Sequence, residues 1–210
     1  NARGEGEKYA ITVKAKSGSF TYDGTEHTVS GFESLTFTVN GEKYTVEGLS
    51  ASASATDATE TAIPVTVTGT AIVKDAEKND VTAQFTVATE NGTLTVAKRT
   101  VTLTSETASK PYDGTPLEKP DVTVTGSFVT GEVTGIKATG SVTHVAQNEV
   151  TNTITYTEGA NFKASNYTIT KNEGKLSITP IAIELTAASD SKTYDGTALT
   201  NNSHEITHGK

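Results

Sequence analysis

The chain has 210 residues, no cysteine and a formal net charge of −8 at pH 7. An acidic chain without clustered Lys and Arg side chains is a poor match for a phosphate backbone, so we expect no nucleic-acid partner. Without cysteine the chain has no disulfide, Cys-based zinc site or thiol nucleophile, and it contains no apolar run long enough to cross a bilayer.

Apolar and polar side chains alternate with a period of two early in the chain, which predicts strands with one buried face. This pattern covers residues 8–15, 35–39 and 44–46, and the last two runs flank Asn40-Gly41. Because Asn-Gly between two alternating runs is the strongest short-range hairpin signal, we predict a hairpin there.

Residues 48–59 are rich in Ala and Ser and allow two interpretations. Helix propensity favours a short helix. A spacing of two favours a strand with small inward side chains, at Leu49, Ala51, Ala53 and Ala55. We predict the strand.

Two later pairs of alternating runs each surround a glycine, which predicts two closing hairpins. The glycines are those of Asn91-Gly92 and Glu173-Gly174. After each predicted hairpin the chain passes almost directly into another alternating run, so the sequence divides into units with very short connections: a first β repeat domain at residues 1–97, a second at 98–179, and the incomplete opening part of a third at 180–210.

The string Tyr-Asp-Gly-Thr occurs once in each unit and indicates tandem repeats. Asp-Gly favours a tight turn because Gly adopts positive φ freely and Asp tolerates it. The string keeps a constant separation from the preceding closing turn, so we predict a structural hairpin turn that fixes how one unit meets the next. Its residues are Tyr22, Asp23, Gly24, Thr25, Tyr112, Asp113, Gly114, Thr115, Tyr194, Asp195, Gly196 and Thr197.

Each complete unit has about seven short alternating strands and no long amphipathic helix, which predicts an all-β fold of tandem immunoglobulin-like antiparallel β-sandwich domains. Small β-grasp-like repeats with a short helix at residues 48–59 are the alternative.

The repeated Asp and Tyr also allow chemical roles, but structural roles are favoured. A calcium site needs about six to eight oxygens, and the neighbours of each Asp supply too few. The rings of Tyr112 and Tyr194 are alternative platforms for a sugar, although packing over the turn or at the junction between units is expected. His204 and His208 spell a zincin-like string, but in a β-repeat and not on a helix.

A cross-link is a further hypothesis, in which Lys98 or Lys110 forms an isopeptide bond with Asn161 or Asn166. The chain has neither the Gly-x-Ser-x-Gly elbow of a serine hydrolase nor a glycine-rich phosphate loop. We therefore expect a protein that is not an enzyme and that has no catalytic residue, no metal site and no cofactor.

The string and its flanks at Ser109–Leu117 and Ser191–Leu199 resemble the YDG/MBG-type repeats of large bacterial cell-surface proteins, as does the stretch Asn166–Ile178. The first unit departs from the pattern at Phe20, His27 and Phe85. The resemblance implies an extracellular location, on a bacterial cell surface or cell wall, in an adhesin or stalk region.

The sequence thus predicts a non-enzymatic stalk or spacer that projects a binding head, with neighbouring repeats of the same chain as its first partners. The alternatives are a module that binds a host glycan or protein near Tyr112 and Tyr194, and a self-associating filament subunit in which residues 180–210 complete a neighbouring chain.

Overall fold

The computed structural model describes residues 7–183 and residue 185. The elements in this range are strands and three short 3-10 helices, and none is an α-helix. The prediction of an all-β protein is therefore confirmed. Stiff β-branched side chains suit this fold because they pack well on a pleated, half-buried surface. No helix of the described part is long and apolar enough to span a membrane.

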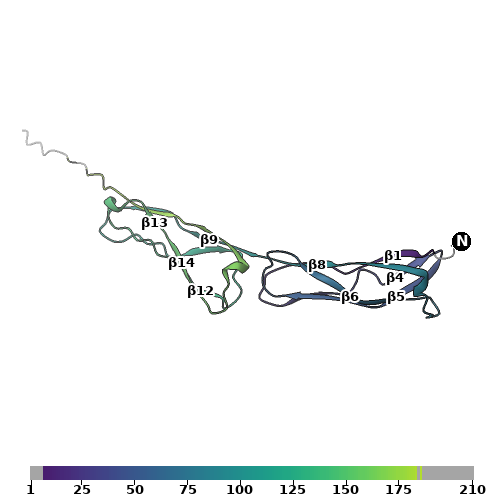
Figure 1. Ribbon diagram of the computed structural model, residues 1–210. Coiled ribbons are helices and arrows are strands. Elements are labelled where there is room, and N and C mark those ends of the chain that lie inside the picture. Colours follow the sequence, from purple (N-terminus) through teal and green to yellow (C-terminus); the bar gives the residue numbers. More distant parts are fainter. Residues whose placement is uncertain (1–6, 184, 186–210) are drawn as a thin grey trace, which may run out of the picture. The chain divides into compact units, whose positions relative to one another are not determined.

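The N-terminal set comprises strands β1–β8 (Figure 1). Its largest sheet has the order β2-β8-β6-β5-β3, with β4 also paired to β5, while β1 and β7 form a separate parallel pair. The bounds are β1 Tyr9–Lys14, β2 Gly18–Thr21, β3 His27–Ser30, β4 Thr36–Val39, β5 Glu42–Ala55, β6 Ile63–Lys74, η1 Thr82–Gln84, β7 Phe85–Glu90 and β8 Gly92–Ala97.

The C-terminal set comprises strands β9–β16. Its sheets have the orders β11-β9-β15, β10-β16-β13 and β12-β14. The bounds are β9 Arg99–Ser105, β10 Ala108–Pro111, β11 Val122–Thr125, β12 Val133–Ala138, η2 Val145–Gln147, β13 Val150–Thr151, β14 Ile154–Glu158, η3 Ala164–Asn166, β15 Tyr167–Asn172 and β16 Lys175–Thr179.

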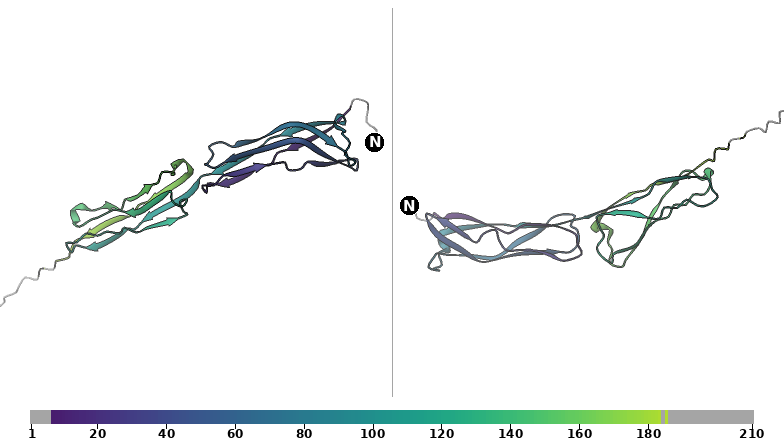
Figure 2. Two further views of the ribbon diagram at one scale, coloured as in Figure 1. Left: turned by 90° about the horizontal axis from the view of Figure 1, so that it is seen from below. Right: turned by 180° about the vertical axis from the view of Figure 1, so that it is seen from behind.

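The two sets share one pairing pattern. In the N-terminal set the opening strands β1 and β2 pair in parallel with the closing strands β7 and β8. In the C-terminal set β9 and β10 pair in parallel with β15 and β16. Figure 2 shows the C-terminal set from two further sides, with the yellow-green closing strands beside the teal strand β9. The two opening strands of each set are therefore paired directly with its two closing strands.

The two predicted closing hairpins are wrong. Strands β7 and β8 follow each other in the chain, but β7 pairs with β1 whereas β8 pairs with β2 and β6. Strands β15 and β16 separate in the same way. Alternating runs around a glycine look the same in the sequence whether they pair with each other or with earlier strands, so the pattern did not reveal the parallel pairing. The three sheets with three or more strands are mixed, the pair β1–β7 is parallel, and only the pair β12–β14 is purely antiparallel.

The hairpin at Asn40-Gly41 is confirmed. Strands β4 and β5 pair antiparallel around it, and φ is 51° at Asn40 and 79° at Gly41, as a type I′ turn requires. The strand predicted within residues 48–59 is also confirmed as far as Ala55, with Ala51 buried. The alternative of a β-grasp repeat with a helix at this place is therefore wrong.

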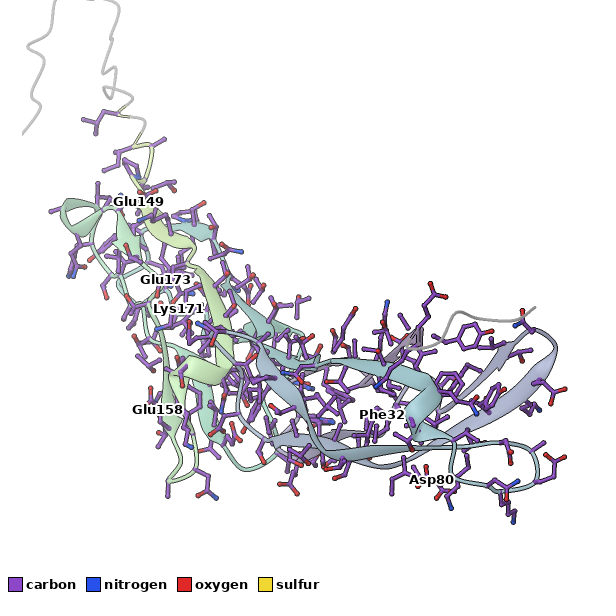
Figure 3. The ribbon with its side chains drawn as sticks, turned by 45° about the vertical axis from the view of Figure 1, so that its right-hand side comes forward. Phe32, Asp80, Glu149, Glu158, Lys171 and Glu173 are labelled. Carbon is purple, nitrogen blue, oxygen red and sulfur yellow. The ribbon has the colours of Figure 1, made fainter. Side chains whose placement is uncertain are left out.

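Strand β14 pairs with β12 alone, and side chains supply hydrogen bonds to its backbone on the other side. The backbone N–H of Ile154 donates to Glu173 Oε2 (2.7 Å), and the carbonyl of Ile154 accepts a bond from Lys171 Nζ (3.2 Å). Figure 3 shows Lys171 and Glu173 close together on this part of the C-terminal set. Lys171 in β15 and Glu173 just after it thus supply polar partners for a backbone that lacks a strand on that side.

One buried cluster contains side chains from both sets. Its fully buried members, each at most 1 % exposed, are Val65, Leu94, Val96, Val101, Leu103 and Ile154. A second cluster, around Val46, Val73 and Phe85, lies within the N-terminal set, and a third, around Leu176 and Ile178, lies within the C-terminal set. The described residues up to Thr179 belong to one compact unit. The predicted division at residue 97 stays a prediction.

Several sequence-based hypotheses lie outside the described residues. They concern the third copy of the repeated string (Tyr194, Asp195, Gly196 and Thr197), the zincin-like pair (His204 and His208) and the proposed completion of a neighbouring chain by residues 180–210. Each of these stays a prediction.

Candidate functional site

The first copy of the repeated string forms an Asx turn between β2 and β3. Asp23 Oδ1 accepts hydrogen bonds from the backbone N–H of Thr25 (2.9 Å) and from its hydroxyl (2.7 Å). Gly24 has a φ of 82°, which glycine adopts at little cost. Because β2 and β3 lie at opposite edges of their sheet, the prediction of a hairpin turn is wrong. The turn leads the chain from one sheet edge to the other.

The second copy has the same local geometry. Asp113 Oδ1 accepts bonds from the backbone N–H (2.9 Å) and the hydroxyl (2.7 Å) of Thr115, and Gly114 has a φ of 81°. These bonds, the one from the threonine hydroxyl first, lower the pKa of Asp113 to about 2, and the pKa of Asp23 falls to about 2 for the same reason. A carboxylate that accepts several hydrogen bonds is favoured in its charged form.

Both copies begin at the same place relative to a closing strand. The backbone N–H of Tyr22 donates to the carbonyl of Ala97 at the end of β8 (2.9 Å), and that of Tyr112 donates to the carbonyl of Thr179 at the end of β16 (3.0 Å). The two tyrosine rings nevertheless differ in environment, since Tyr22 is 4 % exposed and Tyr112 is 38 % exposed.

Tyr22 shares a buried carboxylate with a tyrosine of the C-terminal set. Its hydroxyl donates to Glu132 Oε2 (2.6 Å), while the hydroxyl of Tyr167 donates to Glu132 Oε1 (2.5 Å). The two rings meet edge to face with centroids 5.6 Å apart, a favoured aromatic geometry. Glu132 is 5 % exposed, so its two oxygens depend on these hydroxyl donors in place of water.

A tight turn positions Glu132. Its backbone N–H donates to the carbonyl of Val129 (3.0 Å), and Gly131 has a φ of 87°, the value that the third position of a type II turn needs. The backbone N–H of Val129 in turn donates to the hydroxyl oxygen of Tyr167 (3.0 Å). The turn and the Tyr167 side chain therefore fix each other's position, and the Glu132 carboxylate points at Tyr22.

Burial and the shared carboxylate both keep the two phenols protonated. Burial raises the pKa of Tyr167 to about 12, with the bond to Glu132 as the next cause. The pKa of Tyr22 is raised further, again by burial first and by the Glu132 bond second. A negative phenolate beside a buried carboxylate would be a like-charge pair with little solvent screening.

Further bonds join the two sets around this centre. Arg99, the first residue of β9, donates from Nη1 to the carbonyl of Tyr22 (3.3 Å). Asp57 accepts bonds from Lys163 Nζ (2.9 Å) and from Asn166 Nδ2 (3.1 Å), and the backbone N–H of Ala58 donates to Asn166 Oδ1 (2.8 Å). Asn166 is 1 % exposed and has polar partners on both sides of its amide. We call this whole arrangement the Glu132 junction.

Both lysines of the isopeptide hypothesis, and Asn166, have other polar partners in the structure. Lys110 Nζ bonds within its own repeat string, to Thr115 Oγ1 (2.7 Å) and Asp113 Oδ2 (3.2 Å). Lys98 Nζ lies 3.9 Å from Glu60. Asn166 bonds to Asp57 and Ala58 as described above. Residues 7–183 and 185 contain no group of three or more His, Cys, Asp or Glu side chains arranged to hold a metal ion.

Sequence reasoning missed most of the Glu132 junction. It singled out Tyr22 and expected packing over the turn or at a junction, but it did not name Glu132, gave Arg99 no contact, and assigned Tyr167 to a hairpin. The only local signal for Glu132 is the preceding Gly131, which marks a turn and not a contact. Comparisons with models of protein families, with curated proteins and with solved structures found no match.

Alkaline pH is expected to weaken the fold above pH 10. Tyr167 has its ordinary pKa of 10.0 when unfolded and about 12 when folded. A group with a raised folded pKa contributes its full stabilisation below the unfolded value and loses it as the pH rises through the folded value. Urea titrations at a series of pH values should show a falling free energy of unfolding from pH 10 to about 12, and a smaller fall in Tyr167→Phe. An equal fall in both proteins would contradict the assignment.

Proposed function

We propose that this chain is a non-enzymatic repeat region of an extracellular bacterial surface protein, a stalk or adhesin segment that projects a binding head. The repeated Tyr-Asp-Gly-Thr string and its flanks support the location, through their resemblance to surface-protein repeats. The parallel pairing of opening with closing strands supports the mechanical role, and it is the observation that carries the proposal.

Because the opening and closing strands are paired in parallel, a pulling force applied to the two chain ends loads the hydrogen bonds between them in shear. A force along the chain enters the N-terminal set at β1 and leaves it after β8. Since β1 runs parallel to β7 and β2 runs parallel to β8, this force pulls paired strands along each other in opposite directions. The evenly spaced bonds of a parallel ladder then share the force instead of opening one at a time. The pairs β9–β15 and β10–β16 repeat this arrangement in the C-terminal set.

The Glu132 junction supports the transfer of force from one set to the next. The last residue of β8, Ala97, and the first residue of β9, Arg99, are separated by Lys98 alone. The buried bonds from Tyr22 and Tyr167 to Glu132 lie beside this short connection and oppose movement of one set against the other. A spacer of a surface protein needs this stiffness to keep its distal end away from the surface.

Single-molecule pulling tests the mechanical role. Cysteine handles are readily introduced because the chain has none of its own. With handles at residues 7 and 179 we expect high rupture forces, because the opening and closing strands are then loaded in shear. Handles at Thr36 and Thr45, which face each other at the open end of the β4–β5 hairpin, load the same fold in an unzipping direction and serve as the matched control. Forced unfolding reports the unfolding rate under load. Equal rupture forces in the two directions would overturn the proposal.

A further inference from the structure

The chain contains two Asn-Gly dipeptides, and the fold puts them in different surroundings. Asn40-Gly41 forms the exposed tip of the β4–β5 hairpin, whereas Asn91-Gly92 lies where the chain passes from β7 to β8. An asparagine side chain is prone to lose ammonia when glycine follows it, because glycine has no Cβ to shield its backbone nitrogen from the amide. The two sites therefore share one reactivity and differ in structure.

The reaction is an intramolecular substitution that consumes only water. The backbone nitrogen of the glycine gives its proton to hydroxide and attacks Cγ of the asparagine. The C–N bond of the side-chain amide breaks, and the nitrogen takes up protons from water and leaves as ammonia. Water then opens the cyclic imide at either carbonyl, which yields aspartate, or isoaspartate with a main chain one carbon longer. Because both reacting groups belong to one chain, local geometry controls the rate.

The surroundings of Asn40 allow this attack. Strand β4 ends at Val39 and β5 begins at Glu42, so the nitrogen of Gly41 lies outside both strands. A Cβ at Gly41 would have no atom of the described residues within 4 Å, so the imide ring has room. Asn40 Nδ2 donates a hydrogen bond to the hydroxyl of Tyr9 at the exposed surface (2.8 Å). This bond slows the rotation of the amide towards Gly41, but only modestly, because water can replace it.

The surroundings of Asn91 oppose the same attack. Asn91 Oδ1 accepts a hydrogen bond from the backbone N–H of Val67 in β6 (2.9 Å), next to the paired residues Val65 and Gly92. Gly92 is buried and lies so close to Lys16 that a Cβ would overlap the Lys16 carbonyl oxygen. Imide formation would have to break the bond to Val67 and move Gly92 within this contact. It therefore requires local opening of the sheet.

We propose that Asn40 is a site of spontaneous deamidation, where the bond to Tyr9 sets the rate, and that the fold prevents the reaction at Asn91. The modification needs no enzyme and does not depend on the proposed mechanical role. It adds a negative charge at the hairpin tip, beside Glu42. Molecules of the protein therefore become chemically different with age at one defined position.

Isoaspartate at this position also disturbs the packing behind the hairpin. The two-residue turn fixes the register of β4 against β5, and one extra main-chain carbon alters that register. The ring of Phe37 in β4 lies 5.4 Å from that of Tyr44 and 5.3 Å from that of Phe85, measured between centroids. A shift of β4 moves Phe37 away from both rings and weakens this aromatic cluster.

Peptide mapping by mass spectrometry tests the site. The native protein is kept in a mildly alkaline buffer, and the conversion of each dipeptide is followed with time. We expect Asn40 to react about tenfold or more faster than Asn91, because reaction at Asn91 requires local opening. In urea, where the chain is unfolded, the two rates should become equal. Equal rates in the native protein would overturn the proposal, and so would a difference that persists in urea, because it would assign the selectivity to the flanking sequence.

Tyr9→Phe tests the assigned control of the rate. We expect Asn40 to react about fivefold faster in this variant, the factor that one net hydrogen bond contributes. The rate at Asn91 should stay unchanged, and it serves as the internal control for an intact fold. An unchanged rate at Asn40 beside an unchanged rate at Asn91 would overturn the role of Tyr9.

Asn40→Asp separates the effect of the added charge from that of the longer main chain. Ion-exchange chromatography isolates the aged protein by its extra negative charge, and urea denaturation compares its isoaspartate fraction with the variant. We expect the isoaspartate fraction to unfold at a lower urea concentration, and Asn40→Asp to remain close to the fresh protein, because Asp tolerates positive φ. An isoaspartate fraction as stable as Asn40→Asp would contradict the predicted shift of β4.

Discussion

Glu132→Gln is expected to lower the free energy of unfolding by about 2 kcal/mol, the cost of weakening two charge-assisted hydrogen bonds and leaving one buried donor without an acceptor. The amide of glutamine has one oxygen, so it accepts from only one of the two tyrosine hydroxyls. Its NH2 group faces the other hydroxyl, and if this is Tyr167, the phenol oxygen already accepts the backbone N–H of Val129. The hydroxyl proton of that tyrosine then has no partner in a buried site.

Urea denaturation followed by tyrosine fluorescence measures this loss, since the chain has no tryptophan to mask the signal. Glu158→Gln is the matched control, because Glu158 is an exposed glutamate at the end of β14 (Figure 3). Exposed substitutions change stability by no more than about 0.5 kcal/mol. If the free energy of unfolding falls by the same small amount in both variants, the shared carboxylate does not stabilise the junction.

Gly92→Ala is expected to destabilise the protein by about 3 kcal/mol or more, because the backbone has to move to admit one methyl group. A Cβ at this position would overlap the carbonyl oxygen of Lys16 and lie 2.7 Å from its carbonyl carbon. The chain crosses between sheets at Lys16 and again at Gly92, and the two crossings lie against each other. In the C-terminal set, a Cβ at Gly174 would overlap the carbonyl group of Glu106 in the same way.

Gly41→Ala is the control that distinguishes close approach from turn conformation. Gly41 has a φ of 79° in a real hairpin turn, but a Cβ at this residue would have nothing within 4 Å. Alanine at this position is therefore destabilising only because it must adopt the left-handed conformation, which costs about 1 to 2 kcal/mol. Thermal unfolding of both variants compares the two effects. A Gly92→Ala protein as stable as Gly41→Ala would show that Gly92 is an ordinary turn residue, as the sequence first indicated.

Local features of this fold could be read from the sequence because their causes are local. The hairpin at Asn40-Gly41 depends on a dipeptide that adopts positive φ, and the strand through Ala51 depends on alternation of small side chains. The Asx turns at Asp23 and Asp113 follow from Asp-Gly-Thr itself, since the acceptor and both donors lie within three residues. In each case the residues that decide the structure are neighbours in the chain.

The pairing of strands could not be read in this way. Gly92 and Gly174 carry the same turn signal as Gly41, yet they mark crossings between sheets. The reason is that β7 and β15 bury their apolar side chains against earlier strands, β1 and β9, which are remote in the sequence. Pairing of this kind follows from the packing of a whole core and leaves no trace in the spacing of a short run.

The all-β class and the recurrence of Tyr-Asp-Gly-Thr follow from the sequence alone, because alternation and repetition are properties of the chain. The burial of Tyr22 and the exposure of Tyr112 follow from the folded arrangement, since the two strings are identical. The difference comes from Glu132 and Tyr167, which are more than a hundred residues from Tyr22 and contact it only after both strand sets have formed. Buried hydrogen bonds between residues so far apart in sequence depend on the three-dimensional arrangement of their partners, and the same string therefore has a partner in one copy and an exposed ring in the other.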